Sequence, residues 1–314
     1  MAKEHVVAVV RLPAAPLLEH DLSGWTGEIR LGSEVGLGML PRWSTPDRPL
    51  RPPKLPFRGA SALPKSINWG YRVNPGSDDP IHDELALGAV QAVFESAHSS
   101  ADAAAKLMKA EGEAWASRLT EWIEVYTRQD LHPTEPFVSM HEVGERIEVL
   151  FQREGGWKRG RAQSWRLTAV EWRPLSDDEW SRSVDAANDA VEPPLAHRLL
   201  RDARHEIHLD RLREATLLLA SALEVALRPV VEWHLLIGGK TVPARTTLGQ
   251  LTEAARKMGK LVPLLPRLAA PSSKPGFLSR RNGATHGAVV PVRDEVLADS
   301  AEVHATVNAI FPLL

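Results

Sequence analysis

The stretch from Leu212 to Arg228 reads LREATLLLASALEVALR, and it decides the fold of the last third of the chain. Its apolar residues recur at steps of three and four, the spacing that places side chains on one face of an α-helix. The stripe comprises Leu212, Ala215, Leu219, Ala222, Leu223, Ala226 and Val230. We therefore predict a helix from Leu209 to about Leu236, with Pro229 able to kink it near its end.

Further helical signals lie on both sides of this stretch. A first helix is predicted from Leu195 to about His208. The segment Thr247-Leu248-Gly249-Gln250 is a capping-box pattern, which opens a third helix that runs to about Lys257. A helix or turn follows from Phe277 to His286, and Val292 to Phe311 has the apolar spacing of a final helix. Residues 195–314 are thus expected to form an all-α bundle.

The preceding residues have a mixed character and end at a proline pair. At 314 residues, the chain is about twice the usual length of a single domain, so two domains are the default expectation. The segment Glu192-Pro193-Pro194 stops a helix and marks the boundary. We expect an α+β domain over residues 1–192, with a small antiparallel sheet and long helices. Its role is not legible from the sequence.

Within that first domain the pattern changes several times. The predicted strands comprise His5–Leu12, Trp25–Leu31, Phe137–Met140, Glu145–Gln152 and Ala162–Trp172, with a turn at Glu154-Gly155-Gly156. Apolar spacing in an alanine-rich stretch predicts one broken helix or a helical pair from Asp83 to Arg128, with the break at Ser99-Ser100. A capping-box pattern at Ser176 to Glu179 predicts a last helix, which ends near Ala190.

The composition restricts the kinds of partner and compartment. A formal charge of -2 and a pI near 6.6 give no overall basic character, so any contact with nucleic acid must be local. The chain has no cysteine, which excludes disulfides and thiolate metal sites and fits a reducing compartment. We find no uninterrupted apolar stretch of about 18 residues and no signal-peptide pattern. We expect a cytoplasmic protein without a membrane segment.

The segment Arg281-Asn282-Gly283-Ala284-Thr285-His286-Gly287 follows the long helix and a shorter one, and precedes a final helix. This order of elements resembles the HEPN family over the last 120 or so residues. The signature of that family is an arginine, usually followed by a polar residue, with a histidine four to six positions further on. The resemblance leaves the N-terminal domain uncovered.

These residue types suit RNA cleavage on physical grounds. Imidazole is the side chain that titrates nearest neutral pH, so His286 is the candidate to take the 2'-hydroxyl proton and return one to the leaving oxygen. The guanidinium of Arg281 complements the charge of a phosphorane, and Arg280 is a cation that can hold an adjacent phosphate. Asn282 can hydrogen-bond the imidazole or the substrate. The resemblance also marks Glu224, whose carboxylate can orient Arg281 or His286.

Each of these residues also has a purely structural interpretation. Arg281 can form a salt bridge with Glu224 inside the bundle, and His286 can satisfy a helix end. His205 and His208 sit three apart on one helix face, but two imidazoles without a third ligand make a poor metal site. The densest basic and aromatic cluster, from Arg153 to Arg166, is more simply the exposed side of a hairpin than a grip on nucleic acid.

The resemblance implies an endoribonuclease that needs neither metal nor cofactor and leaves a 2',3'-cyclic phosphate. It also implies a toxin or an antiphage defence (abortive infection) effector whose partners are RNA and an antitoxin or a sensor ligand. The alternative is a non-catalytic helical adaptor that dimerises and binds nucleotide, nucleic acid or a partner protein. Because one copy offers one imidazole and the reaction needs a base and an acid, we expect a homodimer with a composite site.

Overall fold

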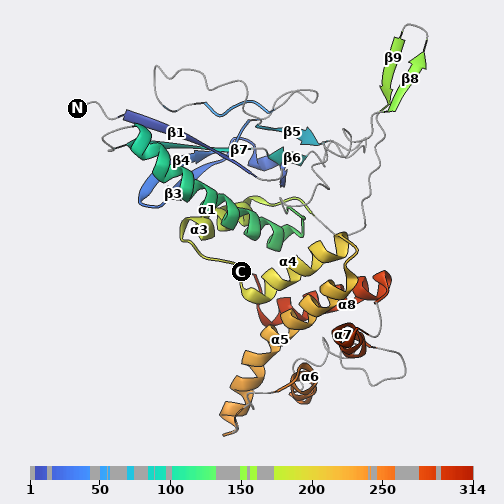
Figure 1. Cartoon of the computed structure of the whole chain (residues 1–314). Coiled ribbons are helices and arrows are strands. Elements are labelled where there is room, and N and C mark those ends of the chain that lie inside the picture. Colours follow the sequence, from blue (N-terminus) through green and yellow to red (C-terminus); the bar gives the residue numbers. More distant parts are fainter. Residues whose placement is uncertain are drawn as a thin grey trace. The chain divides into compact units, whose positions relative to one another are not determined.

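A computed structural model shows two compact units, residues 1–192 and 193–314, and each is described by itself (Figure 1). The structure describes residues 4–12, 16–42, 50–54, 56, 69–73, 84–87, 89–96, 101–131, 149–153, 156–160, 173–239, 241, 246–258, 276–287 and 291–313. The first unit combines antiparallel sheets with helices, and the second is helical, so the expected fold class is confirmed. The division falls at the Pro193-Pro194 pair.

The main sheet of the first unit has four antiparallel strands in the order β1-β7-β4-β3. These strands are β1 (Glu4–Arg11), β3 (Thr26–Leu31), β4 (Glu34–Met39) and β7 (Ala89–Ser96). β7 pairs with β1 over its whole length, from Glu4 opposite Ser96 to Arg11 opposite Ala89. The predicted strands at His5–Leu12 and Trp25–Leu31 correspond to β1 and β3.

The prediction of helix from Asp83 is wrong up to Ser96. This segment forms two strands, β6 (Glu84–Leu87) and β7, and the helix α1 begins only at Ala101 and ends at Thr127. β7 lies between two other strands, and its residues from Ala89 to Phe94 are all buried. A strand buried on both faces loses the alternation that identifies strands in sequence, so its alanines and spacing resembled a helix.

Two helices pack on one face of this sheet, α1 and α3 (Asp177–Asn188) (Figure 1). Trp115 on α1 and Trp180 on α3 are fully buried in the core between helices and sheet. Trp180 makes an edge-to-face contact with Trp25, with ring centroids 5.6 Å apart. The described tryptophans of this region therefore serve packing.

Both ends of α3 are fixed by side-chain hydrogen bonds. Ser176 and Glu179 form the predicted capping box at its beginning. At its end, the Asn188 side chain accepts from the backbone N–H of Arg30 at 2.9 Å and donates to the carbonyl of Glu28 at 2.9 Å. This amide occupies the outer edge of β3 as a neighbouring strand would, so that edge is protected against pairing with another chain.

A second sheet and a hairpin complete the described part of this unit. β2 (Leu17–Glu19), β6 and β5 (Gly70–Val73) form an antiparallel sheet in the order β2-β6-β5. β8 (Val149–Arg153) pairs with β9 (Gly156–Gly160), whose first residue is the last glycine of the predicted turn. The predicted strands Phe137–Met140 and Ala162–Trp172 lie outside the described residues, as does the part of the basic cluster after Gly160.

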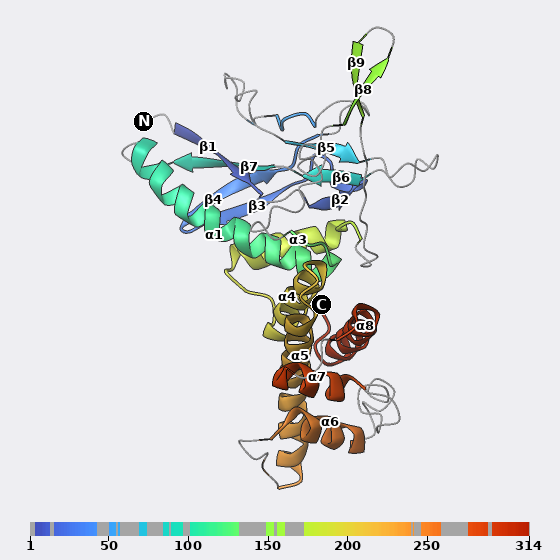
Figure 2. The same ribbon diagram turned by 45° about the vertical axis from the view of Figure 1, so that its right-hand side comes forward.

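The second unit is built on α4 (Leu195–His208) and α5 (Leu212–Ile237), which pack along each other (Figure 2). The remaining helices are α6 (Leu248–Lys257), α7 (Phe277–His286) and α8 (Arg293–Ile310). Six of the seven residues of the predicted stripe on α5, from Leu212 to Ala226, are buried. α5 continues through Pro229, and Thr247 and Gln250 form the predicted capping box of α6.

The chain end after α8 is tied to α4 by a histidine. The His197 imidazole donates from Nε2 to the carbonyl of Phe311 at 2.8 Å. Burial lowers the pKa of His197, so the imidazole is kept neutral. The neutral ring carries the Nε2 proton that it donates to the Phe311 carbonyl. Within the described residues, each helix is either too short or too polar to cross a bilayer.

Candidate functional site

The helix α7 carries the sequence motif, and its own packing sets the directions of the motif side chains. Phe277 and Ala284 are buried, and α7 packs against α5 (Figure 2). Gly287 then adopts a φ of 69°, a left-handed conformation that suits glycine, and its N–H donates to the carbonyl of Ala284. Asn282 and His286 are consequently exposed, and Arg281 is partly exposed.

Two polar residues of the motif share one face of α7, and a hydrogen bond connects the third to it. Asn282 and His286 are four residues apart, so they lie on the same helix face. Arg281 Nη1 donates to Asn282 Oδ1 at 3.1 Å, which links the guanidinium to that face. Arg281 and His286 themselves are five residues apart, and their Cβ directions differ by about 140° around the helix axis. One α7 therefore does not bring this guanidinium and imidazole together directly.

Among the described residues, the imidazole of His286 and the guanidinium of Arg281 have no charged partner. The imidazole makes no hydrogen bond or ion pair with any residue that the structure describes. Arg281 has no carboxylate partner there, and its hydrogen bond goes to the neutral amide of Asn282. Neither residue forms the structural contacts that the sequence left open for it. Both groups are available to a ligand.

The guanidinium of Arg280 is paired with carboxylates of α8. Its Nε donates to Asp299 Oδ2 at 2.7 Å, its Nη2 donates to Asp299 Oδ1, and its Nη1 lies 3.7 Å from Glu295 Oε1. The side chain is only 15% exposed, and that of Asp299 is 6% exposed. The hydrogen bonds to Asp299 raise the pKa of Arg280, so the guanidinium stays charged, while burial raises the pKa of Asp299. Arg280 holds α7 on α8, and we leave it out of the proposed phosphate site.

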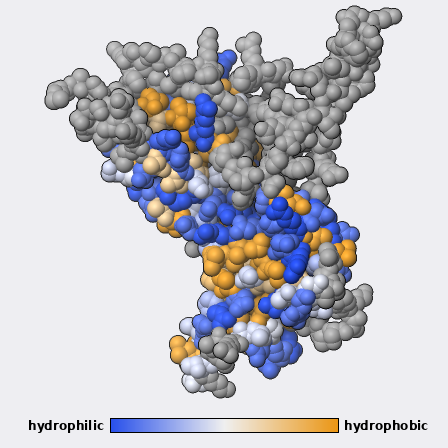
Figure 3. All heavy atoms as spheres, viewed as in Figure 1, coloured by the Kyte–Doolittle hydropathy of each residue, from blue (hydrophilic) through white to orange (hydrophobic). Residues whose placement is uncertain are grey.

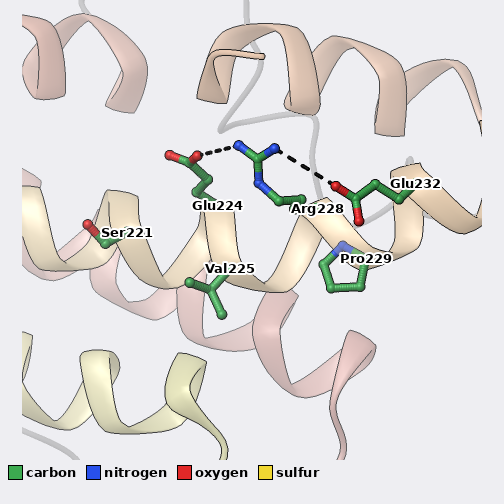
Figure 4. A pocket seen from close by; sticks show the side chains of 6 residues that line it. All are labelled: Ser221, Glu224, Val225, Arg228, Pro229 and Glu232. Atoms are coloured by element: carbon green, nitrogen blue, oxygen red, sulfur yellow. Dashed lines mark hydrogen bonds and ion pairs between the residues drawn. The ribbon is translucent and has the colours of Figure 1, made fainter. Parts of the chain in front are cut away.

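Glu224 is also not joined to the motif. Its carboxylate accepts from Arg228 Nη2 at 2.8 Å on its own helix, and Arg228 Nη1 lies 3.9 Å from Glu232 (Figure 4). Among the described residues it contacts neither Arg281 nor His286. The expected role of Glu224 in orienting the motif therefore has no support in this geometry.

A groove on the surface of α5 is separate from the motif on α7. It has a volume of about 420 Å³. It is lined by Ser221, Glu224, Val225, Arg228, Pro229 and Glu232 (Figure 4). The groove contains no residue of α7, and its cation is shared between two carboxylates. We do not assign the motif chemistry to it.

The structure adds one residue that the sequence did not single out. Arg213, in the first turn of α5, donates from Nε to the carbonyl of Ala284 at 2.8 Å. The two residues are 71 positions apart in the chain, and no motif spacing connects them. The packing of α7 on α5 is what brings them together. Arg213 thus lies at the helix end that carries His286.

Metal ligation has no candidate in the described parts of the chain, where no group of three or more potential histidine or carboxylate ligands gathers. His205 and His208 are among these described residues. No protein-family model, curated protein or solved structure matches this chain.

Proposed function

We propose that this chain is a metal-independent endoribonuclease of the HEPN type. The supporting observation is the exposed region of α7, where a guanidinium and an imidazole lie beside an amide and have no charged partner among the described residues. In this proposal His286 removes the proton from a ribose 2'-hydroxyl, and the 2'-oxygen attacks the phosphorus. The P–O5' bond breaks, the leaving oxygen takes up a proton, and a 2',3'-cyclic phosphate remains.

The separation of Arg281 and His286 around α7 supports a shared site between two copies. A single imidazole cannot act as the base on one side of the phosphorus and, in the same step, as the acid on the other side. A two-fold axis beside α7 brings a second His286 and a second Arg281 to the same phosphate, and two-fold dimers are the commonest oligomers. We therefore propose a homodimer through the helical unit, with RNA as its substrate.

The biological role that fits this activity is a toxin or an antiphage defence effector. The first unit is then the module that binds an antitoxin or a sensor ligand. We place this activity in the cytoplasm, a reducing compartment that suits a chain without cysteine.

The direct test is cleavage of RNA by the purified chain in excess EDTA. We expect products that end in a 2',3'-cyclic phosphate, because the proposed chemistry uses an imidazole and a guanidinium and no cation. The products are identified by mass spectrometry, and RNA with 2'-O-methyl groups is the control that must stay intact. A strict requirement for Mg²⁺ or Mn²⁺ contradicts this mechanism.

Mixing wild-type chain with the His286→Ala variant tests the composite site. If both imidazoles are needed, a mixed dimer is inactive, so an equal mixture retains about one quarter of the wild-type activity once subunits have exchanged. If each copy works alone, about one half remains. The rate is measured as a function of the wild-type fraction. A linear dependence rules out the shared site and leaves a site within one chain.

One observation favours the alternative of a non-catalytic adaptor. Trp233, Leu236 and Ile237, at the end of α5, have exposed fractions of 66, 68 and 67%. Apolar surface comes to the exterior of the helical unit (Figure 3). Such residues are enriched in protein-binding surfaces. A chain that leaves RNA intact under every condition, including the presence of phage or an activating ligand, supports the adaptor.

A further inference from the structure

Arg213 of α5 is held at the end of α7 that carries His286. Its Nε donates to the carbonyl of Ala284, two residues before His286, at 2.8 Å. The same carbonyl accepts from the N–H of Gly287 at 3.3 Å, where the helix ends. The carbonyls at a helix C-terminus carry a partial negative charge, so they attract and fix a guanidinium. Arg213 is thereby held in place beside the motif.

The hydrogen bond to Ala284 uses only one of the three nitrogens of Arg213. A guanidinium has five N–H donors, and four of these belong to Nη1 and Nη2. In Arg213 these two nitrogens make no hydrogen bond or ion pair with any residue that the structure describes. The side chain is also exposed. It therefore keeps the pair of donors with which arginine binds a phosphate in bidentate fashion.

Arg280 and Arg213 differ in how their guanidinium groups are bound. All three nitrogens of Arg280 face carboxylates of α8, and its side chain is nearly buried. Arg280 is thus committed to the fold, whereas Nη1 and Nη2 of Arg213 have no partner among the described residues. Arg213 therefore adds a cation at the end of α7 that carries His286, where Arg280 does not.

We propose that Arg213 is the second phosphate-binding residue of this site, in place of Arg280. Its Nη1 and Nη2 bind a phosphodiester oxygen pair of single-stranded RNA at the His286 end of α7, while Nε stays on the Ala284 carbonyl. This inference rests on the proposed ribonuclease function for the identity of the ligand. It depends on α5 and α7 of one copy, and it does not require the dimer.

The test measures binding separately from cleavage. The probe is a short fluorescent 2'-O-methyl oligoribonucleotide, which cannot undergo transesterification, and its affinity for the full chain is followed by anisotropy at several salt concentrations. We expect Arg213→Gln to weaken binding about 10-fold at low salt and to reduce the slope of log K against log salt by about 0.7, which is one phosphate contact on a single strand. Glutamine retains a donor for the Ala284 carbonyl.

The matched control is Arg256→Gln. Arg256 is an exposed arginine of α6 whose Nε and Nη2 both donate to Glu253 at 2.8 Å. The substitution removes the same charge from the same unit as Arg213→Gln. Because Arg256 is paired with Glu253 and lies on another helix, the salt slope should not change. A slope for Arg213→Gln equal to that of wild type overturns the inference and leaves Arg213 as a cap of α7. An equal loss of slope in both variants also overturns it, since the effect is then one of net charge.

Two further measurements keep the outcomes distinct. If Arg213→Gln fails to fold, Arg213→Lys is used: it keeps the charge but loses the bidentate geometry, and we expect affinity to fall about threefold. Unchanged affinity in this variant overturns the inference. If the wild type binds the probe through Arg213 but cuts no RNA in EDTA, the ribonuclease proposal fails while Arg213 stands. If the wild type cuts RNA in EDTA but the salt slope of Arg213→Gln equals that of wild type, the ribonuclease proposal stands and the role of Arg213 fails.

Discussion

We expect His286→Ala to lower the rate of RNA cleavage in EDTA by at least about 100-fold, because general acid–base catalysis by a placed imidazole contributes about 10² to 10⁴ in rate. The fold should not change. His286 is exposed and makes no hydrogen bond with the described residues, so the free energy of unfolding should shift by less than about 0.5 kcal/mol. The rate is measured on a defined RNA, and folding is followed by circular dichroism.

The control for this substitution is His234→Ala. His234 is an exposed histidine in the last turn of α5. It lies 21 residues beyond Arg213 on the same helix, which is about 30 Å along the axis. Its loss should leave the cleavage rate unchanged. Equal activity of wild type and His286→Ala would remove His286 from the mechanism, and an unfolded His286→Ala chain would identify it as a structural residue.

The second large effect concerns stability, and we expect Asp299→Ala to lower the free energy of unfolding of the helical unit by about 3 kcal/mol. The substitution removes both hydrogen bonds between the nearly buried guanidinium of Arg280 and Asp299, and the charges that remain nearby, Glu295 at 3.7 Å and Glu302, interact with it more weakly. A buried charge that loses its main partner is costly because the interior does not replace its lost hydration. Hydrogen exchange of peptides from α7 and α8, read by mass spectrometry, reports on this unit separately.

Two variants make this expectation specific. The double substitution Arg280→Met with Asp299→Leu should regain most of the lost stability, because both charges are removed together. Arg281→Ala, at the neighbouring position, should change stability by less than about 0.5 kcal/mol but reduce cleavage. Exchange in α7 and α8 that is equally slow in Asp299→Ala and in wild type would show that the pair does not hold these helices.

The helices of the second unit were predictable from the sequence because their signals are local. The apolar stripe of α5, the capping box of α6 and the end of α4 at His208 each depend on residues within one or two turns. A helix forms its hydrogen bonds within its own segment, so its limits are recorded there. The beginning of α3 at Ser176 follows the same logic.

The strands β6 and β7 were not predictable in this way. A strand completes its hydrogen bonds with partners elsewhere in the chain, and β7 pairs with β1 some 80 residues earlier. Its burial on both faces removes the alternating pattern, and its alanines then favour a helix when judged locally. Only pairing with β1 and β4 in the assembled sheet makes this segment a strand and not a helix.

For the candidate site, the sequence by itself determined which residues are present on α7 and which chemistry they allow. It identified Arg281, Asn282 and His286 as the polar set, and their assignment to RNA cleavage stays a prediction. Tertiary packing decided how the cations are used. Adjacent arginines on a helix point about 100° apart, so the side of α7 that meets α8 commits Arg280 to Asp299 and leaves Arg281 at the surface. The same packing places Arg213 at the end of α7, a relation between residues 71 positions apart that no local pattern encodes.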